Sequence, residues 1–235
     1  MYKNKSIVGI IPARGGSKGL PRKNVLLFSG KPLIAWSIEQ AILSGIFDSI
    51  IVNTDDEEIA TIAHEYGAEV PFMRPKELAA DNVNVMYVIL FVLQKLASEG
   101  VSFDVSVLLQ PTSPLRTADD IIKALEIFFQ KNAQAVVSVC EVEHSPFLMN
   151  MLPLDGCMNN FIRDEMINKN RQDFPKYYRL NGSIYVADVN FLYAENTFFG
   201  KRTYAYVMPQ ERSIDIDTQT DFQIAEFLHS KLSIA

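Results

Sequence analysis

The chain has 235 residues and a formal net charge of −6, which is enough length for one well-buried domain and slightly too little for two. The acidic balance argues against a nucleic-acid-binding protein, because such proteins present a basic face. No stretch approaches the ~18 apolar residues that a membrane-spanning helix needs. The two cysteines, Cys140 and Cys157, cannot build a disulfide framework or a structural zinc site. We therefore expect a single cytoplasmic domain over residues 1–235, with no nucleic-acid or membrane partner.

Short apolar runs, several of them apolar on both faces, predict the β-strands. They lie at residues 6–11, 49–54, 104–110, 135–139, 183–188 and 203–208. Runs of this kind are typical of a parallel sheet that helices cover on both sides. Amphipathic segments alternate with them, so the sequence predicts a three-layer α/β fold with a mostly parallel sheet.

Helix signals lie between these strands. Pro32 stands at a helix-start position, and the amphipathic segment after it stops near Gly45. Thr54 and Glu57 have the spacing of a capping box for the next helix. Thr117 is followed by acidic residues that favour the helix dipole, which predicts another helix N-terminus there.

The alternation of strands and helices stops between residues 143 and 176. This segment mixes Pro, Asn and Met with little periodicity, and it is too apolar for a disordered linker. Two interpretations remain open, an extended arm that buries its apolar residues on a partner subunit and a loop that packs on itself. The first interpretation predicts a homodimer.

The first predicted strand is followed by PARGGSKGLPRKN, residues 12–24, which contains the four cations Arg14, Lys18, Arg22 and Lys23. A glycine-rich loop can turn backbone N–H groups toward an anion, because glycine accepts the positive φ values that this arrangement requires. In open α/β sheets, ligands bind at the carboxyl ends of the strands. The spacing matches neither the P-loop nor the dinucleotide fingerprint. The charge suits a triphosphate, and the alternative is a solvated basic surface loop.

Asp215 and Asp217 lie two residues apart near the end of the chain. If this segment is extended, both carboxylates point to the same side. Mg²⁺ prefers carboxylates together with substrate phosphates. The alternative is an acidic turn before a helix that starts near Thr218. In combination with the phosphate-type loop, the pair predicts a magnesium site.

Gln110 ends the third predicted strand and is followed by Pro111 and Pro114. The prolines are explained by the turn that leads into the next helix. That turn does not explain an amide at the carboxyl end of a strand, so Gln110 is a candidate binding residue.

Five motifs, taken in order, resemble those of the acylneuraminate cytidylyltransferases, the CMP-sialic acid synthetases. They are RGGSKGLPRKN at 14–24, RPKELAADN at 74–82, LLQPTSPLR at 108–116, RLNGSIYV at 179–186 and SIDIDTQTDF at 213–222. The resemblance covers almost the whole chain. It implies a Rossmann-like nucleotidyltransferase fold and a Mg²⁺-dependent transfer of CMP from CTP to the anomeric hydroxyl of a 2-keto nonulosonic acid, with release of pyrophosphate. The family arrangement also agrees with the homodimer.

The resemblance assigns roles to individual residues. On the nucleotide side it implies Arg14, Ser17, Lys18, Lys23 and Asn24 at the triphosphate, Arg74 near the cytosine, and Asp215 and Asp217 at the metal. The catalytic candidates are Arg14, Lys23 and Asp217, the last of which would accept the proton of the attacking hydroxyl. On the sugar side it implies Gln110, Arg171, Arg179, Asn181, Gly182, Tyr185, Phe198 and Phe199. Arginines suit the sugar's carboxylate because a guanidinium binds it in a bidentate way. Without the resemblance, the two adjacent phenylalanines would be read as core.

The chain departs from the family pattern at two places. Relatives commonly carry a Thr-Ala-Ser-Ser-like run where this chain has NVNV at 82–85, and many relatives specific for sialic acid carry a glutamate where this chain has Asn168. Because the remaining motifs are intact, N-acylneuraminic acid is still the first expectation for the substrate. CMP-legionaminic or CMP-pseudaminic acid synthesis is the alternative reaction, and a catalytically inactive nucleotide-binding regulator is the alternative outside enzymes.

Overall fold

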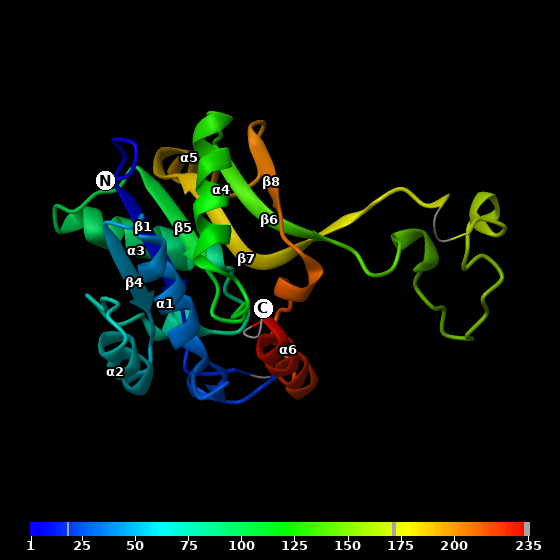
Figure 1. Ribbon diagram of the computed structural model, residues 1–235, viewed down its shortest axis with the longest axis horizontal. Helices are drawn as coiled ribbons and strands as arrows, with labels where there is room; N and C mark the ends of the chain where they lie inside the picture. The colour runs from blue at the N-terminus through cyan, green and yellow to red at the C-terminus, as the bar shows by residue number, and fades with distance from the viewer. Residues whose placement is uncertain (18, 171–172, 233–235) are drawn as a thin grey trace.

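All the strands predicted from the sequence form in the computed structural model, which describes residues 1–17, 19–170 and 173–232. They build a six-stranded sheet of order β4-β1-β5-β7-β6-β8. The strands are β1 (Ile7–Pro12), β4 (Ser49–Asn53), β5 (Val105–Leu109), β6 (Ala135–Glu141), β7 (Tyr178–Asp188) and β8 (Thr203–Val207). Neighbouring strands are parallel except that β7 is antiparallel to both β5 and β6. The prediction of a mostly parallel sheet is confirmed (Figure 1).

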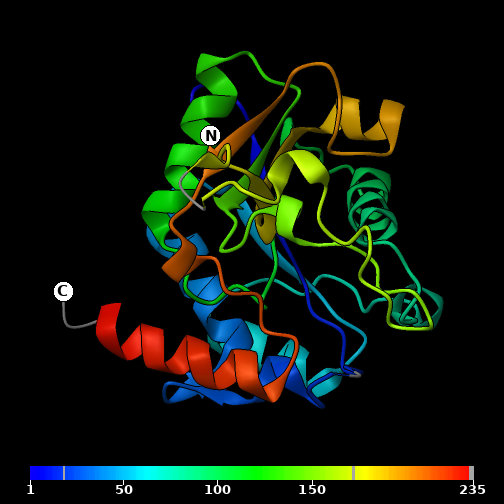
Figure 2. The ribbon, with the colours of Figure 1, turned by 90° about the vertical axis from the view of Figure 1, so that its right-hand side faces the viewer.

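Helices cover both faces of the sheet, and Figure 2 shows α4 and α5 on opposite sides of it. The helices α1 (Leu33–Ser44), α2 (Glu57–Glu65) and α4 (Ala118–Gln130) pack on one face, and α3 (Val85–Ser98) and α5 (Val189–Glu195) pack on the other. The central strand β1 is buried on both faces because successive side chains alternate: Ile7 and Ile11 pack with the first group of helices, and Val8 and Ile10 pack with the second. The three-layer fold is confirmed. None of the helices in the described part of the chain is long and apolar enough to cross a membrane.

The helix signals are confirmed at α1 and α4 and need one correction at α2. Helix α1 ends at Gly45, which has the left-handed conformation with φ 64°, and Thr117 forms a capping box with Asp120 at the start of α4. Helix α2 is capped by Asp56, whose carboxylate accepts the N–H groups of Glu58 and Ile59. The capping box predicted at Thr54 is therefore wrong, because Thr54 is fully buried two residues before the cap.

A smaller apolar cluster holds the C-terminal helix α6 (Gln219–Leu232) against the first loop. Phe222 of α6 packs edge-on against Phe28 of the short hairpin β2 (Leu27–Phe28) and β3 (Lys31–Pro32). Leu20, Leu115 and Ile216 belong to the same cluster. The loop after β1, the loop after β5 and the segment before α6 therefore meet at one edge of the sheet. The helix predicted to start near Thr218 is α6, and Asp221 accepts hydrogen bonds from the N–H and Oγ1 of Thr218 at its first turn.

The irregular segment of the sequence leaves the body of the protein between β6 and β7 and extends away from it (Figure 1, right). Its base continues the β6–β7 pairing, because the N–H of Val142 donates to the carbonyl of Tyr177. It includes the short 3-10 helices η3 (Pro146–Leu148) and η4 (Asp164–Met166). Apolar side chains such as Met151 and Leu154 are fully exposed on it. The described part of the segment thus has the form of an arm, and its role in dimerisation stays a prediction.

Candidate functional site

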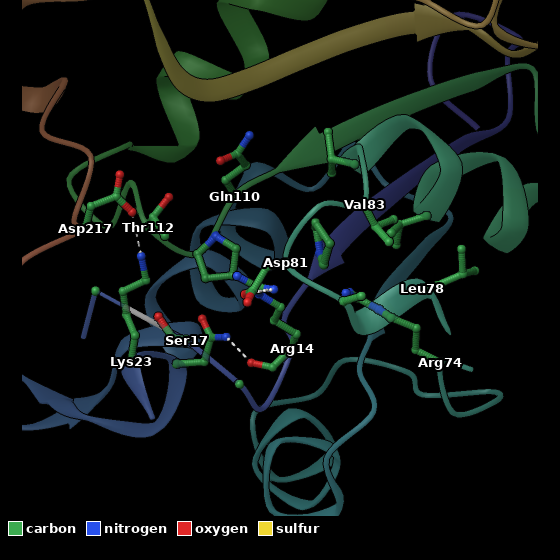
Figure 3. Close-up of a pocket in the computed structure, with 18 residues that line it drawn as sticks. Arg14, Ser17, Lys23, Arg74, Leu78, Asp81, Val83, Gln110, Thr112 and Asp217 are labelled. Atoms are coloured by element: carbon green, nitrogen blue, oxygen red, sulfur yellow. Dashed lines mark hydrogen bonds and ion pairs between the residues drawn. The ribbon is translucent and has the colours of Figure 1, made fainter. Parts of the chain in front are cut away.

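A pocket of about 430 Å³ lies at the carboxyl ends of β1 and β5 (Figure 3). Residues that follow these two strands, Arg14 and Gln110, both line it. Its wall also contains residues from three further parts of the chain: Gly16, Ser17, Gly19, Lys23 and Asn24 of the first loop, Arg74, Leu78, Ala80, Asp81, Val83, Val85 and Val88 around the start of α3, and Asp217 before α6. The pocket brings together most of the residues predicted for the nucleotide. Lys18 lies outside the described residues.

Two cations of the first loop are held at the pocket wall by carboxylates. Arg14 forms an ion pair with Asp81 at 2.7 Å between Nη1 and Oδ1. Lys23 is almost completely buried, and its Nζ donates to the carbonyl of Ile216 and, at 2.9 Å, to Oδ1 of Asp217. Figure 3 shows both pairs, Lys23 with Asp217 at the left and Arg14 with Asp81 near the centre. Cations in a partly dry site attract an anion more strongly than cations in water, so these two side chains suit a phosphate chain.

Arg74 belongs to the same wall and is buried, with 6% of its surface exposed. Its Nε donates to Oδ1 of Asn53 at 2.8 Å, and its Nη2 donates to the carbonyl of Asn53 at 2.6 Å. Burial lowers the pKa of Arg74 to about 10, and the charge of Asp55 opposes this effect. Arg74 therefore fixes the segment before α3 to the end of β4, and its contact with the cytosine stays a prediction.

The first loop is shaped by close packing, which corrects the reason given for its glycines. Gly15 and Gly16 do not have positive φ values. A Cβ atom on Gly15 would lie 2.5 Å from Oδ2 of Asp56, and a Cβ atom on Gly19 would lie 2.3 Å from the carbonyl oxygen of Asp217. These glycines let the loop approach α2 and the Asp217 segment closely.

Arg22 corrects a second expectation about this loop. It has a left-handed backbone with φ 58°, and its guanidinium pairs with Asp56 and Glu58 at the start of α2. It does not line the pocket. Arg22 therefore anchors the loop to α2, and of the four cations the described structure places Arg14 and Lys23 at the pocket.

Asp215 and Asp217 flank Ile216, which is fully buried in the cluster under α6. The N–H of Ile216 donates to the carbonyl of Thr112 at 2.8 Å, which ties this segment to the loop after β5. Asp217 is exposed, whereas Oδ1 of Asp215 is buried without a hydrogen-bond partner in the described structure. Burial raises the pKa of the Asp215 carboxyl; the nearby hydroxyl of Thr112 opposes this effect, and the charge of Asp217 adds to it.

These carboxylates fit the predicted magnesium ion. A buried carboxylate oxygen without a partner, beside a second carboxylate, gains from a bound cation. No group of three or more His, Cys, Asp or Glu side chains that could hold a metal occurs among the described residues. The fit is therefore to an ion that takes two carboxylates and completes its shell with substrate phosphates and water, as Mg²⁺ does.

Four of the residues predicted for the sugar, Arg179, Asn181, Gly182 and Tyr185, lie on β7, at or next to a bulge. Val137 of β6 pairs with Tyr185, but Val139 pairs with Leu180, so residues 181–184 bulge opposite Ser138. Gly182 lies in this bulge with φ 73°. A Cβ atom there would lie 3.5 Å from Oε1 of Gln110 and 3.5 Å from Oδ2 of Asp215, so the bulge, the end of β5 and the metal candidate meet at one point.

The other sugar-side candidates differ in what their side chains already contact. Asn181 is buried, and its amide is engaged on both ends, by Ser138 and Ser183 at Oδ1 and by Ser213 at Nδ2. Arg179 donates to the carbonyl of Ser213 at 3.3 Å. Through these hydrogen bonds Asn181 and Arg179 stabilise the bulge. That they also bind the sugar stays a prediction.

The aromatic candidates are divided between core and surface. Tyr185 contacts Phe198 with ring centroids 5.0 Å apart, and Phe198 is buried in the core on the α3 side of the sheet. Phe199 is exposed. The alternative reading of the pair as core thus holds for Phe198. Arg171 lies outside the described residues.

The sequence analysis did not single out two residues that shape the site. Asp81 holds Arg14, and the signal for it was its place in the motif RPKELAADN. Arg116 ends the motif LLQPTSPLR; it is almost completely buried, and it donates to the carbonyls of Gln110 and Ser183 and to the hydroxyl of Ser37. Of the run at 82–85, Val83 and Val85 line the pocket and Asn84 caps α3.

Relatives with similar sequences cover most of this chain. CMP-N,N'-diacetyllegionaminic acid synthase from Legionella pneumophila is 38% identical over 229 residues, which are 94% of this chain and 95% of that protein. Pseudaminic acid cytidylyltransferase from Campylobacter jejuni is 36% identical over 221 residues, 94% of each chain. N-acylneuraminate cytidylyltransferase from Escherichia coli is 37% identical over 226 residues, 96% of this chain and 52% of that longer protein.

The fold and the family agree with these relatives. A solved structure of CMP:2-keto-3-deoxy-manno-octonic acid synthetase in complex with CTP matches with a TM-score of 0.71 over 97% of this chain and 99% of that chain, at 18% identity, which shows the fold alone. A family profile described as Cytidylyltransferase matches residues 8–232. With a profile that covers nearly the whole sequence and relatives of this similarity, the chain belongs to the cytidylyltransferase family.

Proposed function

We propose that the protein transfers CMP from CTP to the anomeric hydroxyl of a 2-keto nonulosonic acid and releases pyrophosphate. The observation that carries the proposal is the pocket at the carboxyl ends of β1 and β5, whose lining includes Arg14, Lys23, Arg74 and Asp217. Nucleotidyl transfer depends mainly on positioning and on stabilising charge, and this residue inventory supplies both. Family membership and the names of the relatives support the same reaction.

Each side chain has a role that follows from its place. Arg14 and Lys23 would bind the triphosphate, with Ser17 and Asn24 of the same loop beside them; Lys18 lies outside the described residues and stays a candidate from the sequence. The sugar's anomeric oxygen attacks the α-phosphorus, the bond between the α- and β-phosphates breaks, and the hydroxyl proton passes to a base, for which Asp217 is the candidate. Lys23 already donates a hydrogen bond to Asp217. In the proposed complex, Lys23 would therefore contact both the phosphate chain and the carboxylate of Asp217. Gln110 and Gly182 lie where the sugar would approach.

Asp215 and Asp217 would hold Mg²⁺. When bound, the ion would neutralise phosphate charge and orient the α-phosphate. The unpartnered oxygen of Asp215 supports this assignment. Removing divalent cations with EDTA should abolish pyrophosphate release, and added Mg²⁺ should restore it.

The identity of the sugar is a choice among three related acids. The relatives named for legionaminic, pseudaminic and N-acylneuraminic acid are 38%, 36% and 37% identical to this chain, so identity alone does not separate them. N-acylneuraminic acid is our first candidate because the five motifs are present. Asn168 favours one of the other two acids, because many relatives specific for sialic acid carry a glutamate at this position.

One experiment tests the proposal. The protein is incubated with each nucleoside triphosphate, Mg²⁺ and a panel of nonulosonic acids, and pyrophosphate is measured. We expect release with CTP and at least one nonulosonic acid, and not with the other triphosphates. No release with any pair would refute the reaction, and a hundredfold preference for legionaminic acid over N-acetylneuraminic acid would keep the reaction and replace the sugar.

A further inference from the structure

A carboxylate outside the pocket connects the loop after β5, which carries Gln110, to the segment that carries Asp215 and Asp217. Asp120 is fully buried in the first turn of α4. It accepts hydrogen bonds from Thr117, from the hydroxyl of Tyr206 at 2.7 Å, and from Arg212 at 3.1 Å (Nε) and 2.7 Å (Nη2). The two bonds from Arg212 form a bidentate pair, which fixes orientation as well as distance.

Arg212 lies directly before the segment with the carboxylates. It ends the 3-10 helix η6 (Gln210–Arg212), which leads through Ser213 to Asp215 and Asp217. Downstream, this segment is tied to Thr112 by the N–H of Ile216 and to α6 at Thr218. The ion pair with Asp120 is therefore one of its upstream anchors, beside the hydrogen bonds that Asn181 and Arg179 donate to Ser213.

Asp120 also fixes the loop after β5. It forms a capping box with Thr117, which follows directly on the loop of residues 110–116 that carries Gln110 and Thr112. One carboxylate thus sets the start of α4 and, through Arg212, the start of the Asp215–Asp217 segment. A shift of either loop relative to the other would move the two aspartates away from Gln110 and from the pocket.

We propose that Asp120 and Arg212 are positioning residues, which set the place of Asp215 and Asp217 relative to Gln110 and thereby determine how tightly the site holds a divalent cation with its nucleotide. The inference rests on the proposed function for its catalytic meaning, but cation binding is a separate readout. Partners that orient metal ligands typically contribute about 10–100-fold to metal affinity or activity. A purely structural ion pair would affect only unfolding.

The experiment measures binding of Mn²⁺·CTP and of metal-free CTP to the full chain, by calorimetry and by electron paramagnetic resonance of Mn²⁺. The variants are Arg212→Met, which removes the pair, and Arg212→Lys, which keeps the charge but loses the fork. Lys123→Met is the matched control, because it removes an exposed ion pair with Asp119, 2.6 Å long, from the same helix. All measurements are made well below the melting temperature of each variant, with folding checked by circular dichroism.

We expect Arg212→Met to weaken Mn²⁺·CTP binding at least about tenfold relative to metal-free CTP, within the range of such orienting partners. Arg212→Lys should be intermediate and Lys123→Met unchanged. If Arg212→Met does not fold, the test uses Arg212→Lys and Tyr206→Phe, which removes another donor to Asp120. The quantity compared is again the Kd for Mn²⁺·CTP relative to the Kd for metal-free CTP. The proposal would be overturned if the ratio of the Kd for Mn²⁺·CTP to the Kd for metal-free CTP were unchanged in the folded variants. It would also be overturned if this ratio were the same in the wild-type protein and in Asp217→Ala, which lacks a proposed metal ligand. A protein that binds Mn²⁺·CTP as expected but releases no pyrophosphate with any sugar would refute the proposed function and leave the positioning role supported.

Discussion

Replacing Gly182 by alanine should lower stability and, beyond that, specifically weaken the use of the sugar. Gly182 has φ 73°, and a side chain in this backbone region costs about 1–2 kcal/mol. The new methyl carbon would lie 3.5 Å from Gln110 Oε1 and from Asp215 Oδ2, which is ordinary contact, so packing adds little to that cost. For a domain of this size ~1 kcal/mol lowers the melting temperature by about 2–4 °C, so we expect a loss of about 2–8 °C.

The matched control is Gly45→Ala. Gly45 has φ 64°, with nothing within 4 Å of an added Cβ atom, so the same substitution carries the same backbone strain. It follows α1 and precedes β4, at the amino edge of the sheet, whereas the pocket lies at the carboxyl edge. Both variants should therefore lose a similar amount of stability, and only Gly182→Ala adds a methyl group between Gln110 and Asp215.

The assay is steady-state pyrophosphate release, with CTP and the sugar varied separately, beside thermal unfolding of both variants. For Gly182→Ala we expect kcat/KM for the sugar to fall at least about tenfold, which corresponds to ~1.4 kcal/mol, while KM for CTP changes little. Gly45→Ala should keep wild-type kinetics. Equal kinetics in the two variants would refute the assignment of the space between Gln110 and Asp215 to the sugar.

Four further predictions follow from the site. Asp217→Ala should lower turnover at least about 10²-fold while metal-free CTP binding changes much less, because a metal ligand at the reacting centre contributes several kcal/mol; near-normal turnover with Mg²⁺ supplied would remove the role. Gly19→Ala should slow pyrophosphate release by about 10²-fold, since its Cβ would lie 2.3 Å from the Asp217 carbonyl and the two segments must move apart; unchanged kinetics would contradict the close approach. The methyl ester of the sugar acid should react poorly, because Arg179 and Arg171 then lose a charge-assisted partner worth about 1.5–3 kcal/mol, and equal rates for ester and acid would argue against both arginines. The arm of residues 143–176 should give a homodimer by light scattering, and a fully active monomer at micromolar concentration would exclude it.

Local patterns in the sequence were sufficient for most of the elements. The β-branched runs at 6–11 and 104–110 are apolar on both faces, and only a strand covered by helices on both sides buries such a run, so β1 and β5 could be placed before any contact was known. Pro32, Gly45 and Thr117 act through their own backbone and the next few residues. Signals of this range are contained in the sequence itself.

Competition between neighbouring polar residues was decided by tertiary contacts. Thr54 and Asp56 are both good N-cap residues, but Asp56 caps α2. Thr54 is buried after the end of β4, and Asp56 also forms an ion pair with Arg22 of the first loop. The same contact removes Arg22 from the set of cations that line the pocket. Arg22 and Asp56 are 34 residues apart in the chain, so neither the loop motif nor the helix-start pattern predicts that they pair.

The strand β7 shows the same division within one motif. The run at 183–188 marked it as a strand, but its antiparallel direction depends on how the arm returns to the sheet, and its bulge depends on Ser138 of β6. The motifs in the sequence were enough to mark the polar residues Asn181, Gln110 and Asp215 as candidates. Which of their atoms already have hydrogen-bond partners depends on folding: the amide of Asn181 is engaged by Ser138 and Ser213, whereas Oδ1 of Asp215 is buried without a partner in the described structure and stays a candidate ligand atom. Whether a polar atom has a hydrogen-bond partner depends on residues that are distant in the chain. A structural residue can therefore be told from a binding residue only once the fold is known.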